Sequence, residues 1–284
     1  MNHPAPAVRP VLVGLLLAGS MVQARAQGVP AEAPAPPIQD NSFLVEEAYN
    51  QESGVVQHIS TFARPRGGGA WSYSFTQEWP LLGQRHQLGF TLPVESAEGP
   101  RGGIGVGDLA LNYRWQVLGI GGARVALAPR VSALLPTGDE ERGRGAGGAG
   151  VQANLPLSVA LSERWVAHSN AGLTHTFSAR NALGQEAGTT GYNLGQSLVW
   201  LAHPRLNLML EAAWSRDEEV AGADATRHGT SFFLAPGIRG AVDLPSGLQV
   251  VPGVAVPVGV GPSDGERAVF LYLSFEHPFG ARRD

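Results

Sequence analysis

The stretch from Leu206 to Ser215 reads LNLMLEAAWS, and its pattern decides the fold. Every second residue from Leu206 to Trp214 is apolar, whereas Asn207 and Glu211 occupy positions between them. Side chains of a β-strand point alternately to its two faces, so this strand would carry one apolar and one polar face. A tilted strand of roughly 9–11 residues crosses the hydrocarbon layer of a membrane, so the length and the pattern together are typical of a membrane barrel.

The same alternation recurs through the chain, as in WSYSFTQEW (71–79) and DLALNYRWQV (108–117). We expect an all-β fold, a transmembrane antiparallel up-and-down β-barrel of about 12 strands within residues 54–279. The expected strands lie near 54–63, 70–79, 85–95, 106–117, 123–135, 149–161, 164–177, 190–202, 205–216, 229–242, 247–258 and 268–279. A soluble β-sandwich is the competing fold, because alternation alone also fits it.

Loop lengths favour the barrel over the sandwich. Short turns, such as HP (203–204), are expected to alternate with longer outward loops, such as SARNALGQEAGTT (178–190) and RDEEVAGADATRH (216–228). Outer-membrane barrels show this alternation of short periplasmic turns and longer outer loops. Four of the six tryptophans, placed at the strand ends beside short turns, predict an interfacial girdle; they are Trp79, Trp115, Trp165 and Trp200.

Several prolines fall inside the expected strands, which conflicts with unbroken pairing because proline lacks the backbone N–H that a ladder needs. We expect local bulges or shortened ladders at these positions, which are Pro129, Pro156, Pro236, Pro252 and Pro257.

The N-terminus predicts export. Residues 1–26 read as a cleaved signal peptide, with Arg9 before a twelve-residue apolar run and Ala24-Arg25-Ala26 as the cleavage pattern. A linker rich in proline and alanine follows over residues 27–39, and residues 280–284 form a C-terminal tail. With the barrel, the signal peptide predicts the cell outer membrane of a Gram-negative bacterium.

Composition excludes several classes of function. The chain has 284 residues, no cysteine and a net charge of -4, and its 20 basic residues are all arginine. Disulfide scaffolds, cysteine–zinc sites and cysteine nucleophiles are therefore excluded. Without a block of basic residues we expect no nucleic-acid partner. No histidine pair has convincing ligand spacing, so neither a metal nor a cofactor is expected.

Three stretches carry a family resemblance: residues 40–62 (DNSFLVEEAYNQESGVVQHISTF), residues 135–139 (LPTGD) and residues 270–279 (FLYLSFEHPF). Through them the chain resembles outer-membrane transporter-like proteins of the "meta-pathway of phenol degradation" family over roughly residues 40–279. The resemblance implies a barrel and the passage of small, aromatic or hydrophobic, solutes. It also implies an assembly signal in the last strand, although the usual terminal phenylalanine is followed here by the tail.

Polar residues on the inner face of the expected strands would line the lumen. They can pair across the interior as a structural network, or they can line a solute path, and their mixed signs favour the network. The absence of a ladder of one sign argues against a dedicated porin for sugar acids or phosphate. The lumen-lining candidates are Glu78, Asp108, Asn112, Arg114, Arg130, His168, Asn170, Glu211, Arg239 and Glu276.

Residues 40–53 precede the first strand as a lead-in or as a plug for the barrel. Asp40, Asn41 and Ser42 are cap candidates, so a short helix is expected over 40–52. The ordered lead-in is the favoured alternative; in the other the segment enters the periplasmic mouth, with Phe43, Glu46, Glu47 and Tyr49 as the plug residues.

We therefore expect a passive channel for small solutes, whose partners are outer-membrane lipid, the barrel-assembly machinery and a small-molecule solute. The alternatives are a non-conducting structural or adhesive barrel and, less favoured, an outer-membrane lipid hydrolase. The hydrolase rests on His168-Ser169-Asn170, which resembles a lipid A deacylase motif. Alternation sends adjacent His168 and Ser169 to opposite faces, so we expect no enzyme.

Overall fold

The computed structural model describes residues 40–98, 102–120, 123–244 and 248–278. The predicted signal peptide (1–26), linker (27–39) and C-terminal tail (280–284) lie outside these residues. None of the helices in the described part of the chain is long and apolar enough to cross a membrane.

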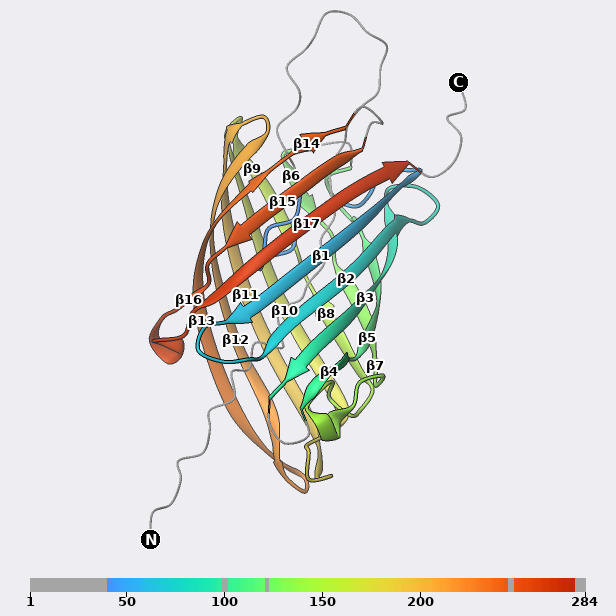
Figure 1. The fold of residues 1–284 in the computed structure, drawn as a ribbon. Helices are drawn as coiled ribbons and strands as arrows, with labels where there is room; N and C mark the ends of the chain where they lie inside the picture. Colours follow the sequence, from blue (N-terminus) through green and yellow to red (C-terminus); the bar gives the residue numbers. More distant parts are fainter. Residues whose placement is uncertain (1–39, 99–101, 121–122, 245–247, 279–284) are drawn as a thin grey trace, which may run out of the picture.

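The described residues form an antiparallel β-barrel (Figure 1). Its strands are β1 (Val55–Pro65), β2 (Trp71–Pro80), β3 (His86–Ala97), β4 (Gly103–Val106), β5 (Leu109–Trp115), β6 (Val125–Leu127), β7 (Arg130–Leu135), β8 (Gly150–Asn154), β9 (Leu157–Ser162), β10 (Trp165–Arg180), β11 (Glu186–His203), β12 (Leu206–Gly222), β13 (Ala225–Gly240), β14 (Val242–Asp243), β15 (Gln249–Ala255), β16 (Val258–Gly259) and β17 (Ala268–Pro278). Two 3₁₀-helices, η1 (Glu140–Arg142) and η2 (Gly261–Ser263), lie in connections.

The barrel is closed. Strand β1 pairs with β2 on one side and with β17 on the other, where the register runs from Val55 opposite Pro278 to Pro65 opposite Ala268. Five pairs of successive strands, separated by one or two residues (β4/β5, β6/β7, β8/β9, β13/β14 and β15/β16), each form one line of the wall. Within the described residues the wall therefore has twelve lines of strand, which confirms the predicted count.

Prolines account for three of these interruptions. Pro129 separates β6 from β7, Pro156 separates β8 from β9, and Pro257 separates β15 from β16. Carbonyl groups still bridge all three gaps, because Pro129 accepts from the Trp115 N–H at 3.0 Å, Pro156 from the Ala128 N–H at 3.2 Å and Pro257 from the Ala268 N–H at 2.9 Å. The expected shortened ladders are thus present at these three positions.

Pro236 and Pro252 lie inside continuous strands, β13 and β15, but one ladder of each strand skips the proline. Strand β13 pairs with β16 as far as Leu234 and with β15 from Gly237, whereas β15 pairs with β13 as far as Gly253 and with β14 from Val250. The expected shortened ladders are therefore present here as well, on one side of each strand. On the other side of its strand each proline still has a register partner: Pro236 lies opposite Leu210 of β12, and Pro252 lies opposite Leu273 of β17.

The predicted extent of two outer loops is wrong. Residues 178–190 and 216–228 were expected to be loops, but β10 extends to Arg180, β11 starts at Glu186, and β12 and β13 pair as far as Gly222 opposite Ala225. The polar sequence does not prevent pairing, since beyond the membrane both faces of a hairpin can meet water. The long strands β10–β13 form the tall side of the barrel in Figure 1.

The outer face of the wall is apolar and aromatic. Leu194, Leu210 and Leu271 are about half exposed on it. Trp165 and Trp200 are register partners near short turns, and their rings stack at 6.0 Å between centroids. Such a rim is typical of the membrane–water interface.

Candidate functional site

The barrel interior holds residues 40–51, which we call the inner segment. All of its side chains except that of Leu44 are buried, and it continues through residues 52–54 into β1. The expected helix over residues 40–52 is wrong, because the segment is extended and irregular. Its backbone groups bind side chains of the wall instead of one another, as the next contacts show.

Glu211 of β12 binds two consecutive backbone amides of the inner segment. Its Oε1 accepts from the Phe43 N–H at 2.8 Å and its Oε2 from the Leu44 N–H at 2.6 Å. The Ser42 hydroxyl donates to the Ser197 hydroxyl of β11 at 2.8 Å beside this contact. A carboxylate that accepts two N–H groups uses both oxygens, which fixes the chain direction as well as its position.

The inner segment continues across several strands of the wall toward the short turns. The Ala48 N–H donates to Ser158 Oγ at 2.8 Å, and Ser158 in turn contacts His168 Nδ1 at 2.7 Å. The Gln51 N–H donates to Gln87 Oε1 at 2.7 Å. Each contact comes from a different strand, so the segment is held around the circumference.

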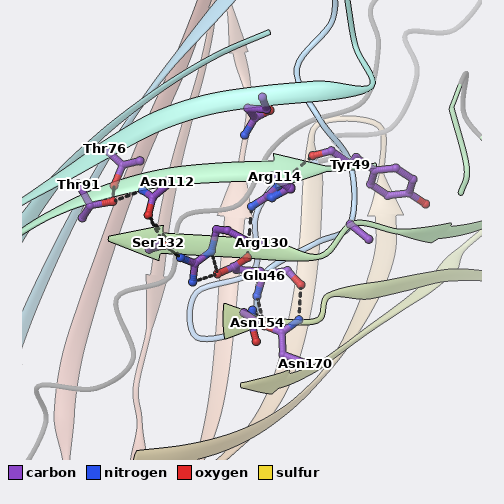
Figure 2. Close-up of polar contacts among 12 residues, drawn as sticks. Glu46, Tyr49, Thr76, Thr91, Asn112, Arg114, Arg130, Ser132, Asn154 and Asn170 are labelled. Carbon is purple, nitrogen blue, oxygen red and sulfur yellow. Dashed lines mark hydrogen bonds and ion pairs between the residues drawn. The ribbon is translucent and has the colours of Figure 1, made fainter. Parts of the chain in front are cut away.

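Glu46 lies between two arginines, Arg114 of β5 and Arg130 of β7 (Figure 2). Its Oε2 is 3.3 Å from Arg114 Nη2, and its Oε1 is 2.7 Å from Arg130 Nη2. Arg114 also donates to the Tyr49 carbonyl at 3.1 Å. Because all three charged side chains are at most 3% exposed, these ion pairs are buried and costly to break.

Asp40 is the anchor at the start of the inner segment. Its carboxylate accepts hydrogen bonds from the Tyr272 and Ser274 hydroxyls of β17 and from the Gln57 amide of β1. Arg239 donates to the Asp40 and Asn41 carbonyls. The contacts from β1 and β17 place this anchor at the seam where the barrel closes.

Phe43 fills an aromatic pocket whose floor is glycine. Its ring packs edge-on against Phe270 and Tyr272, with centroids 6.0 Å apart in both pairs. A Cβ at Gly237 would lie 2.3 Å from the Phe43 ring, and one at Gly253 would lie 2.6 Å from it. Only glycine at these two positions leaves room for the ring.

Burial perturbs two acids of the inner segment. Burial raises the pKa of Glu47 well above its usual range, and the nearby Asp40 adds to this effect, whereas Arg239 and Arg114 oppose it. The pKa of Asp40 is raised by burial as well, against the lowering effect of Arg239 and the hydrogen bonds from β17. Glu47 Oε1 has no hydrogen-bond partner among the described residues.

The structure brings most of the predicted site residues together. All four plug candidates, Phe43, Glu46, Glu47 and Tyr49, are buried in the interior. Eight lumen candidates are buried as well: Glu78, Asn112, Arg114, Arg130, His168, Asn170, Glu211 and Arg239.

Two lumen candidates lie near the ends of the barrel. Asp108, between β4 and β5, accepts from the Gly138 and Ala146 N–H groups and so holds the loop after β7. Glu276 lies two residues before the end of β17; the residue is partly exposed, but its carboxylate Oε1 is buried.

Several residues that bind the inner segment were not found from the sequence. They are Gln57, Gln87, Gln116, Ser158, Ser197, Tyr272 and Ser274, together with the glycines beneath Phe43. Residue parity would have placed them inside the barrel, but only the three-dimensional stagger of the strands shows which ones meet the segment. The motif His168-Ser169-Asn170 also did not reveal that His168 contacts Ser158. Its own serine, Ser169, instead donates a hydrogen bond to Gln196 on the outer side of the wall.

A closed antiparallel barrel with an apolar exterior and a polar, filled interior defines the class of outer-membrane β-barrels. The solved structures that are similar belong to this class. An outer membrane channel from Pseudomonas putida F1 matches 82% of this chain and 98% of its own, with 14% identity and a TM-score of 0.60. The NanC porin matches 79% of this chain and 100% of its own, with 6% identity and a TM-score of 0.51.

At this identity the likeness establishes the fold alone. No family model matches the chain. No curated protein matches it in sequence either.

Proposed function

We propose that this protein is a passive outer-membrane channel for small solutes, and that the inner segment is its plug. The observation that carries the proposal is the way the segment is held. Its backbone bonds mainly side chains of the wall, such as Glu211, Asn170 and Ser158, and its described residues show a single β-bridge, at Tyr49, instead of a ladder. A segment held chiefly by side chains can leave without opening the barrel.

The proposal includes the route to the membrane. The predicted signal peptide exports the chain, the barrel-assembly machinery inserts it, and outer-membrane lipid covers the apolar face. The half-exposed leucines of that face support lipid contact, since a soluble protein rarely exposes so large an apolar surface. We assign no catalysis, no cofactor and no nucleic acid to the protein.

Small, aromatic or hydrophobic, solutes are the class that the family resemblance implies. The interior offers an aromatic surface for them, because Phe270 and Tyr272 would be uncovered once Phe43 withdraws. This surface adjoins polar groups of the wall such as Ser274. A solute with one apolar and one polar part would find both kinds of contact.

A non-conducting structural barrel is the second candidate. The buried pairs of Glu46 with Arg114 and Arg130 favour it, because breaking buried ion pairs is costly and would keep the interior filled. The two candidates differ in whether the inner segment ever leaves.

Planar-bilayer recording of the refolded protein tests the proposal. We expect the full chain to show rare, brief openings and a variant lacking residues 40–52 to show large, sustained ones. Liposomes in a neutral solute such as glycerol should likewise swell slowly with the full chain and rapidly with the variant lacking residues 40–52. Unchanged conductance and unchanged swelling after the deletion would exclude the plug, and a silent bilayer with both proteins would favour the structural barrel.

A further inference from the structure

We propose that the solute carries a carboxylate, and that Glu46 occupies the site at which this carboxylate binds. The inference rests on the proposed channel function and specifies its substrate class as small organic acids. The central observation is the pair of arginines, Arg114 and Arg130, which belong to the wall, whereas the carboxylate between them belongs to the inner segment.

The two arginines are direct neighbours across the wall. Arg114 on β5 is the register partner of Arg130 on β7. Two like charges opposite each other on adjacent strands repel, and burial increases the cost. A carboxylate between the two guanidinium groups, such as that of Glu46, lowers this cost.

Cross-strand neighbours of this pair carry no negative charge. Gln87 pairs with Arg114 on one side, and Asn154 pairs with Arg130 on the other. Beyond Asn154 the same row continues with Gly172 and Asn193. These described register partners thus include amides but no carboxylate, and Glu46 of the inner segment places a carboxylate between the two arginines.

Arg130 keeps its orientation without the inner segment. Its guanidinium donates to Asn112 Oδ1 at 3.3 Å and to Ser132 Oγ, both of which are side chains of the wall (Figure 2). It also donates to Gln152 Oε1 of β8 at 2.8 Å. A planar guanidinium fixed in this way presents its remaining N–H groups toward the interior. When Glu46 withdraws, a preformed carboxylate site is left.

Competition follows from this arrangement. A carboxylate solute and Glu46 cannot both occupy the site between Arg114 and Arg130. The solute therefore stabilises the open channel by binding where the Glu46 carboxylate was. A ligand shifts such an equilibrium only by its differential affinity for the two states, and here the closed state has no vacant site for it. The plug is therefore opened by the class of molecule that the channel passes.

Benzoate and benzamide test the proposal, because they match in size and differ in charge. In the refolded full chain, saturating benzoate should raise the open probability several-fold, and benzamide should leave it unchanged. Glu46→Gln keeps the shape of the side chain but removes its negative charge. In this variant calorimetry should give a Kd for benzoate that is lower by about tenfold or more than in the unaltered protein. Arg130→Gln should abolish that binding, whereas Arg142→Gln, in the exposed 3₁₀-helix η1, should not.

The outcomes separate the two proposals. If glycerol enters liposomes through the variant lacking residues 40–52 but benzoate and benzamide bind and permeate alike, the carboxylate site is wrong and the channel stands. Equal competition by inorganic phosphate would also overturn carboxylate specificity. If no solute passes through any variant, the channel proposal fails, and calorimetry with Glu46→Gln still decides whether the site binds benzoate. If Glu46→Gln does not refold, the comparison of open probability with benzoate and with benzamide in the unaltered chain decides the test on its own.

Discussion

Asn170 of β10 holds Glu46 of the inner segment by two reciprocal hydrogen bonds. The Glu46 N–H donates to Asn170 Oδ1 at 2.7 Å, and Asn170 Nδ2 donates to the Glu46 carbonyl at 2.8 Å. A side-chain amide thus takes the place that a neighbouring strand would take in a ladder. Because the bonded groups of Glu46 are its backbone N–H and carbonyl, this contact fixes the position of the segment whatever side chain residue 46 carries. The contact can also be broken without disturbing the pairing of the wall strands.

The glycine floor beneath Phe43 gives the first prediction. In Gly237→Ala the new methyl group would lie within 2.3 Å of the Phe43 ring, so the ring must leave its pocket. We expect single-channel recording to show openings that are several-fold more frequent than in the unaltered protein, because the plug loses its aromatic anchor. The matched control is Gly229→Ala on the same strand, where the nearest atom is 4.0 Å away. Equal opening frequencies in the two variants would contradict the anchoring role of Phe43.

Glu211 gives the second prediction. Replacing it with glutamine leaves one acceptor oxygen for two N–H groups, Phe43 and Leu44, and turns an amide donor toward one of them. A buried N–H left unpaired costs about 1–3 kcal/mol, so the closed state should weaken by about tenfold or more. Open probability in Glu211→Gln measures this. Glu219→Gln, which removes only the exposed pair with Arg227, should behave like the unaltered protein, and a closed Glu211→Gln channel would refute the prediction.

Channel opening should depend on pH through Glu47. Its pKa is raised well above the usual 4.5 while it is buried, chiefly by burial itself, and would return to the ordinary range in water. The closed state therefore binds the proton more tightly, and opening releases it. As pH falls from the raised pKa toward 4.5, the open probability should fall, by up to about tenfold per pH unit for one proton.

Recording between pH 8 and pH 4.5 in Glu47→Gln checks the origin of this pH dependence. The variant should lose most of the slope, whereas Glu140→Gln in the 3₁₀-helix η1 should keep it. An unchanged slope in Glu47→Gln would assign the effect to another acid, such as Asp40, whose pKa is also raised by burial.

Lipid contact of the outer face gives a prediction about stability. Leu210 is 52% exposed on the outer face of β12, and Val220 lies on the same face ten residues further toward the hairpin end. Arginine at the bilayer midplane costs a barrel about 2–4 kcal/mol and little outside the hydrocarbon layer. Urea unfolding of protein refolded in liposomes should therefore show Leu210→Arg strongly destabilised and Val220→Arg nearly unchanged. Equal stabilities would mean that lipid does not cover this face.

Much of the barrel could be predicted from local pattern. The alternation in residues 206–215 correctly places Asn207 and Glu211 inside and Leu210 outside, because strand parity is a property of the chain alone. The prolines at 129, 156 and 257 interrupt the strands for an equally local reason, the missing N–H. Hairpin lengths beyond the membrane were not predictable in this way, since the water on both faces removes the pattern that marks a strand end.

The inner segment shows where local reasoning stops. The cap residues Asp40 and Ser42 suggest a helix start, yet Asp40 accepts from Tyr272 and Ser274, which lie more than 230 residues further along the chain. Those partners are set by how the closed barrel brings β17 to the segment. One sequence signal was available, namely glycines at inward positions such as Gly237 and Gly253, which make room for a large side chain from elsewhere.

A reversible covalent lock tests the central claim most directly. Ser42 Oγ and Ser197 Oγ are 2.8 Å apart, and the chain has no native cysteine, so Ser42→Cys with Ser197→Cys would join the inner segment to β11 by a single disulfide. We predict that the oxidised double variant is silent in planar bilayers and that a reductant added during recording restores the openings, while each single variant ignores the reductant. Openings of the same size and frequency in the oxidised and reduced double variant would contradict the account, because the solute path would then not need the inner segment to move.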